Sequence, residues 1–254
     1  NHNWLPLLFE VLLGKRIRQY IGGFSGVTSE ICKYELLRAG KNIPSFVASN
    51  GVDVSSVSLR HTSIPLNNEP LNLLCVAQVA KWHGLDRLIC GLADSGNPNV
   101  CLHVVGDGPA IPFLIKLVQE KALEKQVFFH GFKTGQELDD FFNKCHIAVG
   151  SLGVHRKGLQ ETSDLKSREY CARGIPFFSS AFDADFPDSF PYRLKVPADE
   201  SPIEIGTVVD FASKVLSDSN HPQKMREYAA QNLDWTVKMR KLKSFFEEVI
   251  AKER

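Results

Sequence analysis

The sequence has almost no excess of charge of either sign. Lysine and arginine number 30 against 29 aspartates and glutamates, so the formal net charge of the 254 residues is +1. Charges of both signs are interspersed along the chain, whereas a nucleic-acid partner would require a strongly basic face. We therefore expect no nucleic-acid partner.

Long apolar runs are also lacking. The longest one near the start, residues 4–13, is interrupted by Glu10 and followed by Lys15, Arg16 and Arg18. A membrane-spanning helix needs about 20 consecutive apolar residues, and the start shows no signal-peptide pattern. The sequence predicts a cytoplasmic protein, while peripheral contact with the inner face of a membrane stays open.

Metal-binding patterns are scarce as well. The 6 cysteines include no C-x-x-C pair and fit buried, reduced side chains. The histidines are dispersed, and Cys145 and His146, adjacent in a predicted strand, would point to opposite faces. We expect neither a metal nor another cofactor.

From residue 71 onward, apolar strands alternate with helical patterns. This alternation predicts an α/β fold with a doubly wound, Rossmann-like parallel sheet. The predicted strands are 71–79, 100–105, 126–130, 147–151, 176–180 and 193–196, and the helices between them are 85–94, 110–122, 135–144, 165–173 and 202–217. Ligands of such sheets bind beyond the carboxyl ends of the strands, so function is expected in those loops.

The segment 161–180, ETSDLKSREYCARGIPFFSS, combines features of an anion site and a diol site. Glu161 and Glu169, with seven residues between them, flank the start of a helix that Ser163 is expected to cap. Lys166 lies in the first turn of this helix, where its ammonium and the free N–H groups attract phosphate. A carboxylate one or two turns further along the helix is suited to bind a neutral diol. This favours a nucleotide-like ligand. The alternative is a plain surface ion pair between Lys166 and Glu169.

The same segment resembles the double-Glu motif of retaining glycosyltransferases with the GT-B architecture, especially family 4-like enzymes of bacterial polysaccharide and O-antigen assembly. The resemblance implies that Glu169 binds the nucleotide ribose. It implies that Glu161, the candidate catalytic residue, faces the donor sugar or its diphosphate. It also assigns Ser163, Leu165 and Lys166 to the donor, the last two through contacts with the phosphates.

The loop after the first strand is similar to a loop of the same family in which an Arg and, five residues later, a Lys before a Gly clamp the diphosphate. Here those positions carry Gln78 and His83, followed by Gly84. Glutamine offers hydrogen bonds without charge, and histidine is charged only when protonated. Lys81 and Arg156, on predicted strand-end loops, are expected to restore positive charge, and the alternative for each is a solvated surface cation.

Two further loops follow predicted strands. Gly106 and Gly108 belong to a G-D-G-P sequence, which the resemblance places along the nucleotide cleft. The third glycine and the acidic residue of a dinucleotide fingerprint are missing, which argues against NAD. Phe132 and Lys133 follow the next strand, and the resemblance puts them near the base; the alternative is a core Phe132 and a solvated Lys133.

The resemblance also divides the chain into parts. These are a remnant of the acceptor-side N-terminal domain (1–54), a linker (55–70), the nucleotide-sugar-binding C-terminal half of a GT-B architecture (71–234) and a C-terminal helix (235–254). In the resembling family the final helix crosses back to the other domain. Helices are also predicted at 4–14, 28–39 and 221–232, and a short strand at 45–48.

The function implied by the resemblance is hexosyl transfer from a nucleoside diphosphate sugar, with UDP favoured, to a glycan or lipid-linked saccharide. Transfer would retain the anomeric configuration and need no metal, and this donor-binding part alone is expected to be inactive or weakly active. Two alternatives stay open. A nucleotide-sugar epimerase of the same architecture would pair Glu161 with His155, and a noncatalytic nucleotide-sugar-binding module is allowed by Gln78 and His83.

Overall fold

A six-stranded, fully parallel sheet forms the centre of the computed structural model, which describes residues 4–61 and 69–252. The strand order is β5-β4-β3-β6-β7-β8, so the chain reverses direction of winding between β3 and β6. The strands are β3 (Leu71–Val76), β4 (Val100–Val105), β5 (Val127–Phe129), β6 (Ile147–Val149), β7 (Phe177–Ser179) and β8 (Arg193–Lys195). This confirms the predicted doubly wound sheet.

Helices cover both faces of the sheet and create two separate hydrophobic cores. One face carries α3 (Leu85–Ser95), α4 (Ile111–Glu120) and α7 (Ile205–Leu216), and the other carries α5 (Gly135–Lys144), α6 (Leu165–Arg173) and α8 (His221–Asn232). Successive residues of a strand point to opposite faces. In β3, accordingly, Leu73 and Cys75 belong to the first core and Leu74 to the second.

Several strands are shorter than predicted, and β3 shows why. Its ladder ends at Val76 rather than at residue 79, because the chain then turns over the loop that follows β4. The N–H of Ala77 donates to Val105 O at 3.1 Å, and that of Val79 donates to Asp107 O at 2.7 Å. Val79 is apolar and fully buried although it lies outside the strand. The apolar pattern in the sequence therefore extends beyond the end of β3, and the predicted strand was too long.

The N-terminal unit packs two helices against two short parallel strands. It consists of α1 (Trp4–Arg18), β1 (Phe24–Gly26), α2 (Ser29–Ala39) and β2 (Ser45–Val47). The first helix runs four residues beyond its predicted end at residue 14, and Arg18 in the added turn donates to Glu35 of α2 at 3.0 Å. Within the described residues, none of the helices has the length and apolar content that a membrane span needs.

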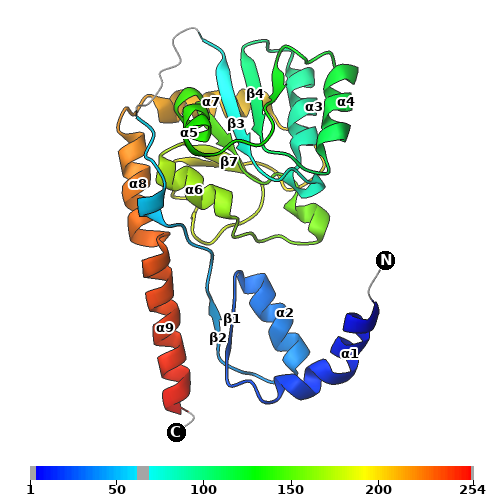
Figure 1. Cartoon of the computed structure of the whole chain (residues 1–254), viewed down its shortest axis with the longest axis vertical. Coiled ribbons are helices and arrows are strands. Elements are labelled where there is room, and N and C mark those ends of the chain that lie inside the picture. The colour runs from blue at the N-terminus through cyan, green and yellow to red at the C-terminus, as the bar shows by residue number, and fades with distance from the viewer. Residues whose placement is uncertain (1–3, 62–68, 253–254) are drawn as a thin grey trace.

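The last helix, α9 (Trp235–Lys252), returns from α8 to the N-terminal unit, as expected from the resemblance (Figure 1). The rings of Phe245 in α9 and Phe46 in β2 stack with centroids 5.5 Å apart. Of the predicted linker 55–70, residues 62–68 lie outside the described residues. Two described segments connect the N-terminal unit with the sheet domain, namely residues 48–61, which follow β2, and α9.

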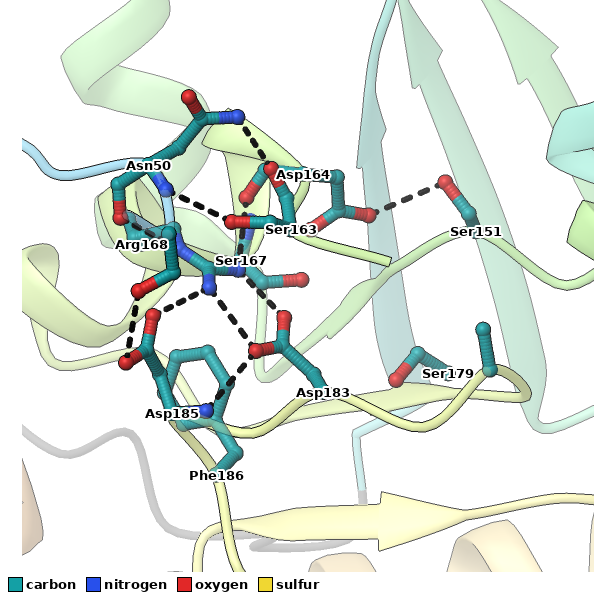
Figure 2. Close-up of polar contacts among 12 residues, drawn as sticks. Asn50, Ser151, Ser163, Asp164, Ser167, Arg168, Ser179, Asp183, Asp185 and Phe186 are labelled. Atoms are coloured by element: carbon teal, nitrogen blue, oxygen red, sulfur yellow. Dashed lines mark hydrogen bonds and ion pairs between the residues drawn. The ribbon is translucent and has the colours of Figure 1, made fainter. Parts of the chain in front are cut away.

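A buried ionic network at Arg168 ties these parts together (Figure 2). The Arg168 side chain in α6 is fully buried and donates to both oxygens of Asp183 and, at 2.5 Å, to Asp185. It also donates to the carbonyl oxygen of Asn50, just beyond the N-terminal unit, at 3.1 Å. Asp185 in turn pairs with Lys238 of α9. One guanidinium thus connects the sheet domain with both segments that lead to the N-terminal unit.

We expect Arg168→Ala to lower the free energy of unfolding by about 3–5 kcal/mol, because it leaves buried carboxylates without their partner. Urea denaturation at pH 7 measures the loss. Lys243→Ala removes an exposed cation that pairs with Glu247 on α9 and should change stability by less than about 0.5 kcal/mol. Equal effects of the two substitutions would contradict a stabilising role for the network.

Candidate functional site

The loops that follow β3, β4 and β5 enclose a cavity of about 620 Å³ at the carboxyl edge of the sheet. This base-side cavity is lined by Val76, Ala77, Gln78, Val105, Gly106, Asp107, Gly108, Phe132 and Lys133. It brings together five of the predicted site residues, namely Gln78, Gly106, Gly108, Phe132 and Lys133. Phe132 is 76% exposed, so the alternative of a core phenylalanine is wrong. Lys133 pairs with Glu137 at 3.0 Å.

Glycine is required in the G-D-G-P turn because two backbone segments touch there. Gly106 has φ +123°, and a Cβ at this position would lie 2.0 Å from the carbonyl oxygen of Ala77. At Gly108 a Cβ would lie 2.3 Å from the carbonyl oxygen of Val79. The glycines therefore shape the floor of the base-side cavity.

A second cavity, of about 410 Å³, lies between the start of α2, the start of α6 and the 3₁₀ helices at residues 81–83 and 154–157. This sugar-side cavity is lined by the predicted residues His83, Glu161, Ser163, Leu165 and Lys166, and also by Thr28, Trp82 and Lys157 among others. Val76 and Ala77 line both cavities. The two cavities therefore adjoin, and one elongated ligand can occupy both.

Lys166 is the main cationic group of the sugar-side cavity. Its Nζ is buried and has no hydrogen-bond partner, and Glu169 pairs instead with Arg173 at 2.8 Å. The alternative of a surface ion pair between Lys166 and Glu169 is therefore wrong. Burial alone would raise the pKa of the nearby Asp164 carboxyl, but the Lys166 ammonium and the Ser167 and Ser151 hydrogen bonds lower it. A buried ammonium that has no hydrogen-bond partner and lies beside a cavity is suited to bind an anion.

His83 contributes a hydrogen-bond donor rather than a charge. Its Nδ1 accepts the N–H of Ala80 at 2.9 Å, which leaves the proton on Nε2. Burial and the positive charge of Lys166 lower the pKa of His83 to about 3. The neutral imidazole is therefore the form present at neutral pH.

Two assignments at the start of α6 need correction or qualification. Asp164 is the cap, since its side chain accepts the N–H of Ser167, so the prediction that Ser163 caps the helix is wrong. Ser163 instead accepts the N–H of Asn50 at 2.8 Å. Glu169 is half-buried and lines neither of the two cavities.

The expected rim of cations is only partly present. Arg156 bonds both Asp86 and Glu200, which raises its pKa and leaves it no free charge for a ligand. Lys81 is exposed and lies beside Arg156 in a separate groove. Gly84 is in the left-handed conformation, with φ +64°. The backbone of residues 152 and 153 packs against it, and a Cβ at Gly84 would lie 2.8 Å from that backbone.

Glu161 is held by the N-terminal unit. Its carboxylate accepts the Ser29 hydroxyl at 2.5 Å and the N–H of Glu30 at 3.1 Å. Burial raises the pKa of Glu161, but these hydrogen bonds outweigh it and lower the pKa below its usual value. The pair that an epimerase would need is not formed, because His155 bonds Glu200 at 2.7 Å.

The expectation of no metal rested in part on the absence of a D-x-D pattern, which is wrong, because Asp183 and Asp185 form one. Both carboxylates bond Arg168, so they are engaged in the structural network. Among residues 4–61 and 69–252 there is no group of three or more His, Cys, Asp or Glu side chains that could hold a metal ion.

Sequence reasoning missed the contributions of Thr28, Ser29 and Trp82. Trp82 is 43% exposed in the sugar-side cavity, and the Lys157 ammonium lies 5.0 Å from its ring centroid. The sequence around Thr28 signals a helix start, but not what that helix faces.

Known proteins show similarity to this chain at the level of family and fold. A family model described as "Glycosyl transferases group 1" matches residues 59–191. The alpha-monoglucosyldiacylglycerol synthase of Acholeplasma laidlawii is 22% identical over 157 residues, which cover 60% of this chain and 38% of that protein.

Two solved structures share the fold. HepE of Anabaena, in complex with UDP, matches with a TM-score of 0.73 and 16% identity over 98% of this chain and 69% of that one. Sucrose-phosphate synthase of Thermosynechococcus elongatus matches with a TM-score of 0.69 and 18% identity over 96% of this chain and 62% of that one. The chain thus spans 38% of the length of the curated relative and 62% of the synthase structure.

Substitution of Gly106 tests the contact between the two loops. Gly106→Ala should destabilise the fold by more than the roughly 1–3 kcal/mol typical of backbone strain alone, because the Cβ also collides with Ala77 O. Gly96→Ala is the matched control, with φ +58° but nothing within 4 Å of the Cβ. Urea denaturation compares them. A loss at Gly106 no larger than at Gly96 would contradict the close contact.

Protonation of His83 should require strong acid. The unfolded imidazole binds a proton below about pH 6.5, whereas the folded one has a pKa of about 3. His83 therefore lowers stability as the pH falls from about 6.5 towards 3. Long-range 1H–15N NMR from pH 4.5 to 8, with His83→Gln to assign the signals, should show one neutral Nε2–H form throughout. A titration midpoint of His83 near pH 6 would contradict its burial beside the Lys166 ammonium.

Proposed function

Because the chain belongs to the family of glycosyl transferases group 1, we propose that it binds a nucleoside diphosphate sugar as the donor part of a glycosyltransferase. The observation that carries the proposal is the buried ammonium of Lys166, which has no hydrogen-bond partner and lies in a cavity that adjoins a second one across Val76 and Ala77. A cationic group in one of two adjoining cavities suits the diphosphate of a ligand that carries a nucleoside at one end and a sugar at the other.

The nucleoside is assigned to the base-side cavity. Its lining is largely apolar, and the exposed ring of Phe132 offers a stacking surface for a base. Gln78 and Lys133 provide polar side chains at the same cavity. UDP is the preferred nucleotide because the family resemblance favours it, and the UDP complex of HepE belongs to a protein of the same fold. Glu169, which accepts a hydrogen bond from Arg173 through Oε1 and keeps further lone pairs free, is retained as the ribose ligand on the family resemblance.

The diphosphate and sugar are assigned to the sugar-side cavity. Lys166, the Nε2–H of His83 and the first N–H groups of α6 would receive the phosphates. Glu161 would face hydroxyl groups of the sugar. With no metal in this scheme, the ammonium and the N–H donors carry the stabilisation of the leaving diphosphate.

The acceptor and the outcome of the reaction belong to the same proposal. A glycan or lipid-linked saccharide would accept the sugar with retention of configuration, at the cytoplasmic side of a membrane. Since the chain spans 38% of the curated relative, its own transferase rate should be low or absent.

A noncatalytic nucleotide-sugar-binding module is the second candidate. It is favoured by the neutral state of His83 and by the uncharged Gln78, because neither of these two positions adds a positive charge against the diphosphate. Donor affinity without turnover in a protein that contains the acceptor domain would favour this candidate. The epimerase alternative has no such support, since His155 is bound to Glu200.

Calorimetric titration with UDP, GDP and ADP, with and without Mg²⁺, tests the donor site. We expect one of the three nucleotides, with UDP as the preferred one, to bind in the absence of Mg²⁺. Lys166→Gln should weaken that binding about tenfold or more, since a charge-assisted contact contributes about 1.5–3 kcal/mol.

Lys116→Gln serves as the control, because Lys116 is an exposed cation on α4 that pairs with Glu120. Its binding should equal that of the unaltered chain. Absence of binding for all three nucleotides, or equal binding by the two variants, would refute the assigned site. A strict requirement for Mg²⁺ would refute the metal-free scheme alone.

A further inference from the structure

The N-terminal unit and the double-Glu segment hold each other by reciprocal hydrogen bonds. Glu161 accepts from the Ser29 hydroxyl at 2.5 Å and from the N–H of Glu30 at 3.1 Å. In the other direction, the Glu30 carboxylate accepts the N–H groups of Gln160 at 3.1 Å and of Glu161 at 3.2 Å. Each unit thus binds a carboxylate of the other.

The start of α2 is well suited to hold a carboxylate. Thr28 caps the helix by accepting the N–H of Ile31, which leaves the N–H of Glu30 for an outside acceptor. The positive end of the helix dipole favours the ionised form of Glu161. A carboxylate that accepts two hydrogen bonds keeps further lone pairs free, and Glu161 also lines the sugar-side cavity.

We propose that Ser29 and Glu30 are positioning residues that hold the Glu161 carboxylate in place to accept hydroxyl groups of the donor sugar. The inference rests on the proposed function, which places the sugar in this cavity. It adds that selection of the sugar depends on α2 of the N-terminal unit. Thr28 and Ile31 of the same helix region line the cavity, so this unit forms part of its wall.

The groups assigned to the base and to the diphosphate take no part in these hydrogen bonds. The residues that line the base-side cavity all lie between positions 76 and 133, and Lys166 lies on α6. Loss of the Ser29 hydroxyl should therefore affect the sugar and leave the nucleotide unaffected. This separates a positioning role from a general role in stability.

Calorimetry with UDP, UDP-glucose, UDP-galactose and UDP-N-acetylglucosamine tests the inference on the full chain. The unaltered chain should bind at least one UDP-sugar more tightly than UDP. Ser29→Ala should reduce that gain about tenfold or abolish it, since a hydrogen bond to a charged group is lost, and should change UDP affinity by less than about twofold. Ser29→Thr retains the hydroxyl and should preserve the gain.

Ser213→Ala is the matched control, because this exposed serine on α7 bonds its own helix at Val209. It should behave as the unaltered chain. Failure of the unaltered chain to bind any of UDP, GDP and ADP would refute the proposed function itself, and if GDP or ADP binds instead of UDP, the sugars of that nucleotide replace the UDP-sugars in the test. If UDP binds, the positioning role is overturned when no UDP-sugar binds more tightly than UDP, when Ser29→Ala keeps the gain, or when Ser29→Ala weakens UDP equally.

Discussion

A single buried guanidinium constrains how the two units of this protein meet. Arg168 is fully enclosed, so each of its N–H groups must find an acceptor inside the protein. It finds them on Asn50, on Asp183 and Asp185 after β7, and on the Asp164 carbonyl of its own helix. The first turn of the same helix carries Lys166, and Glu161 lies shortly before it. The position of the candidate site is therefore fixed by the network that also joins the units.

Positive charge in the candidate site is concentrated on few groups. His83 is neutral, and Arg156 is neutralised by two carboxylates, which leaves Lys166 as the buried ammonium that faces the cavity. A diphosphate bound there would rely on N–H donors as much as on charge. Hydrogen bonds position a ligand well, but they stabilise a developing negative charge less than a second cation would. A site that relies on N–H donors more than on cations agrees with a slow transferase and equally with a module that only binds the nucleotide sugar.

Periodicity in the sequence predicted the fold well, because strands buried on both faces and amphipathic helices leave clear patterns. The rule that ligands bind at carboxyl strand ends also predicted the loops of the site. The partners of individual side chains were not predictable. Arg156 is bound by Asp86 and Glu200, and Glu161 by Ser29, all distant in sequence. Such pairings depend on tertiary packing, which local patterns do not encode.

The two cavities differ in what builds them. Residues 76–133 of the sheet domain line the base-side cavity, whereas the sugar-side cavity takes Val27, Thr28 and Ile31 from the N-terminal unit. A change in the angle between the units would therefore alter the sugar-side cavity and leave the base-side cavity intact. In the proposed scheme, nucleotide affinity would reside in one domain, while recognition of the sugar would require both. The carboxylate proposed to face the sugar, that of Glu161, accepts hydrogen bonds from Ser29 and Glu30 of the opposite unit.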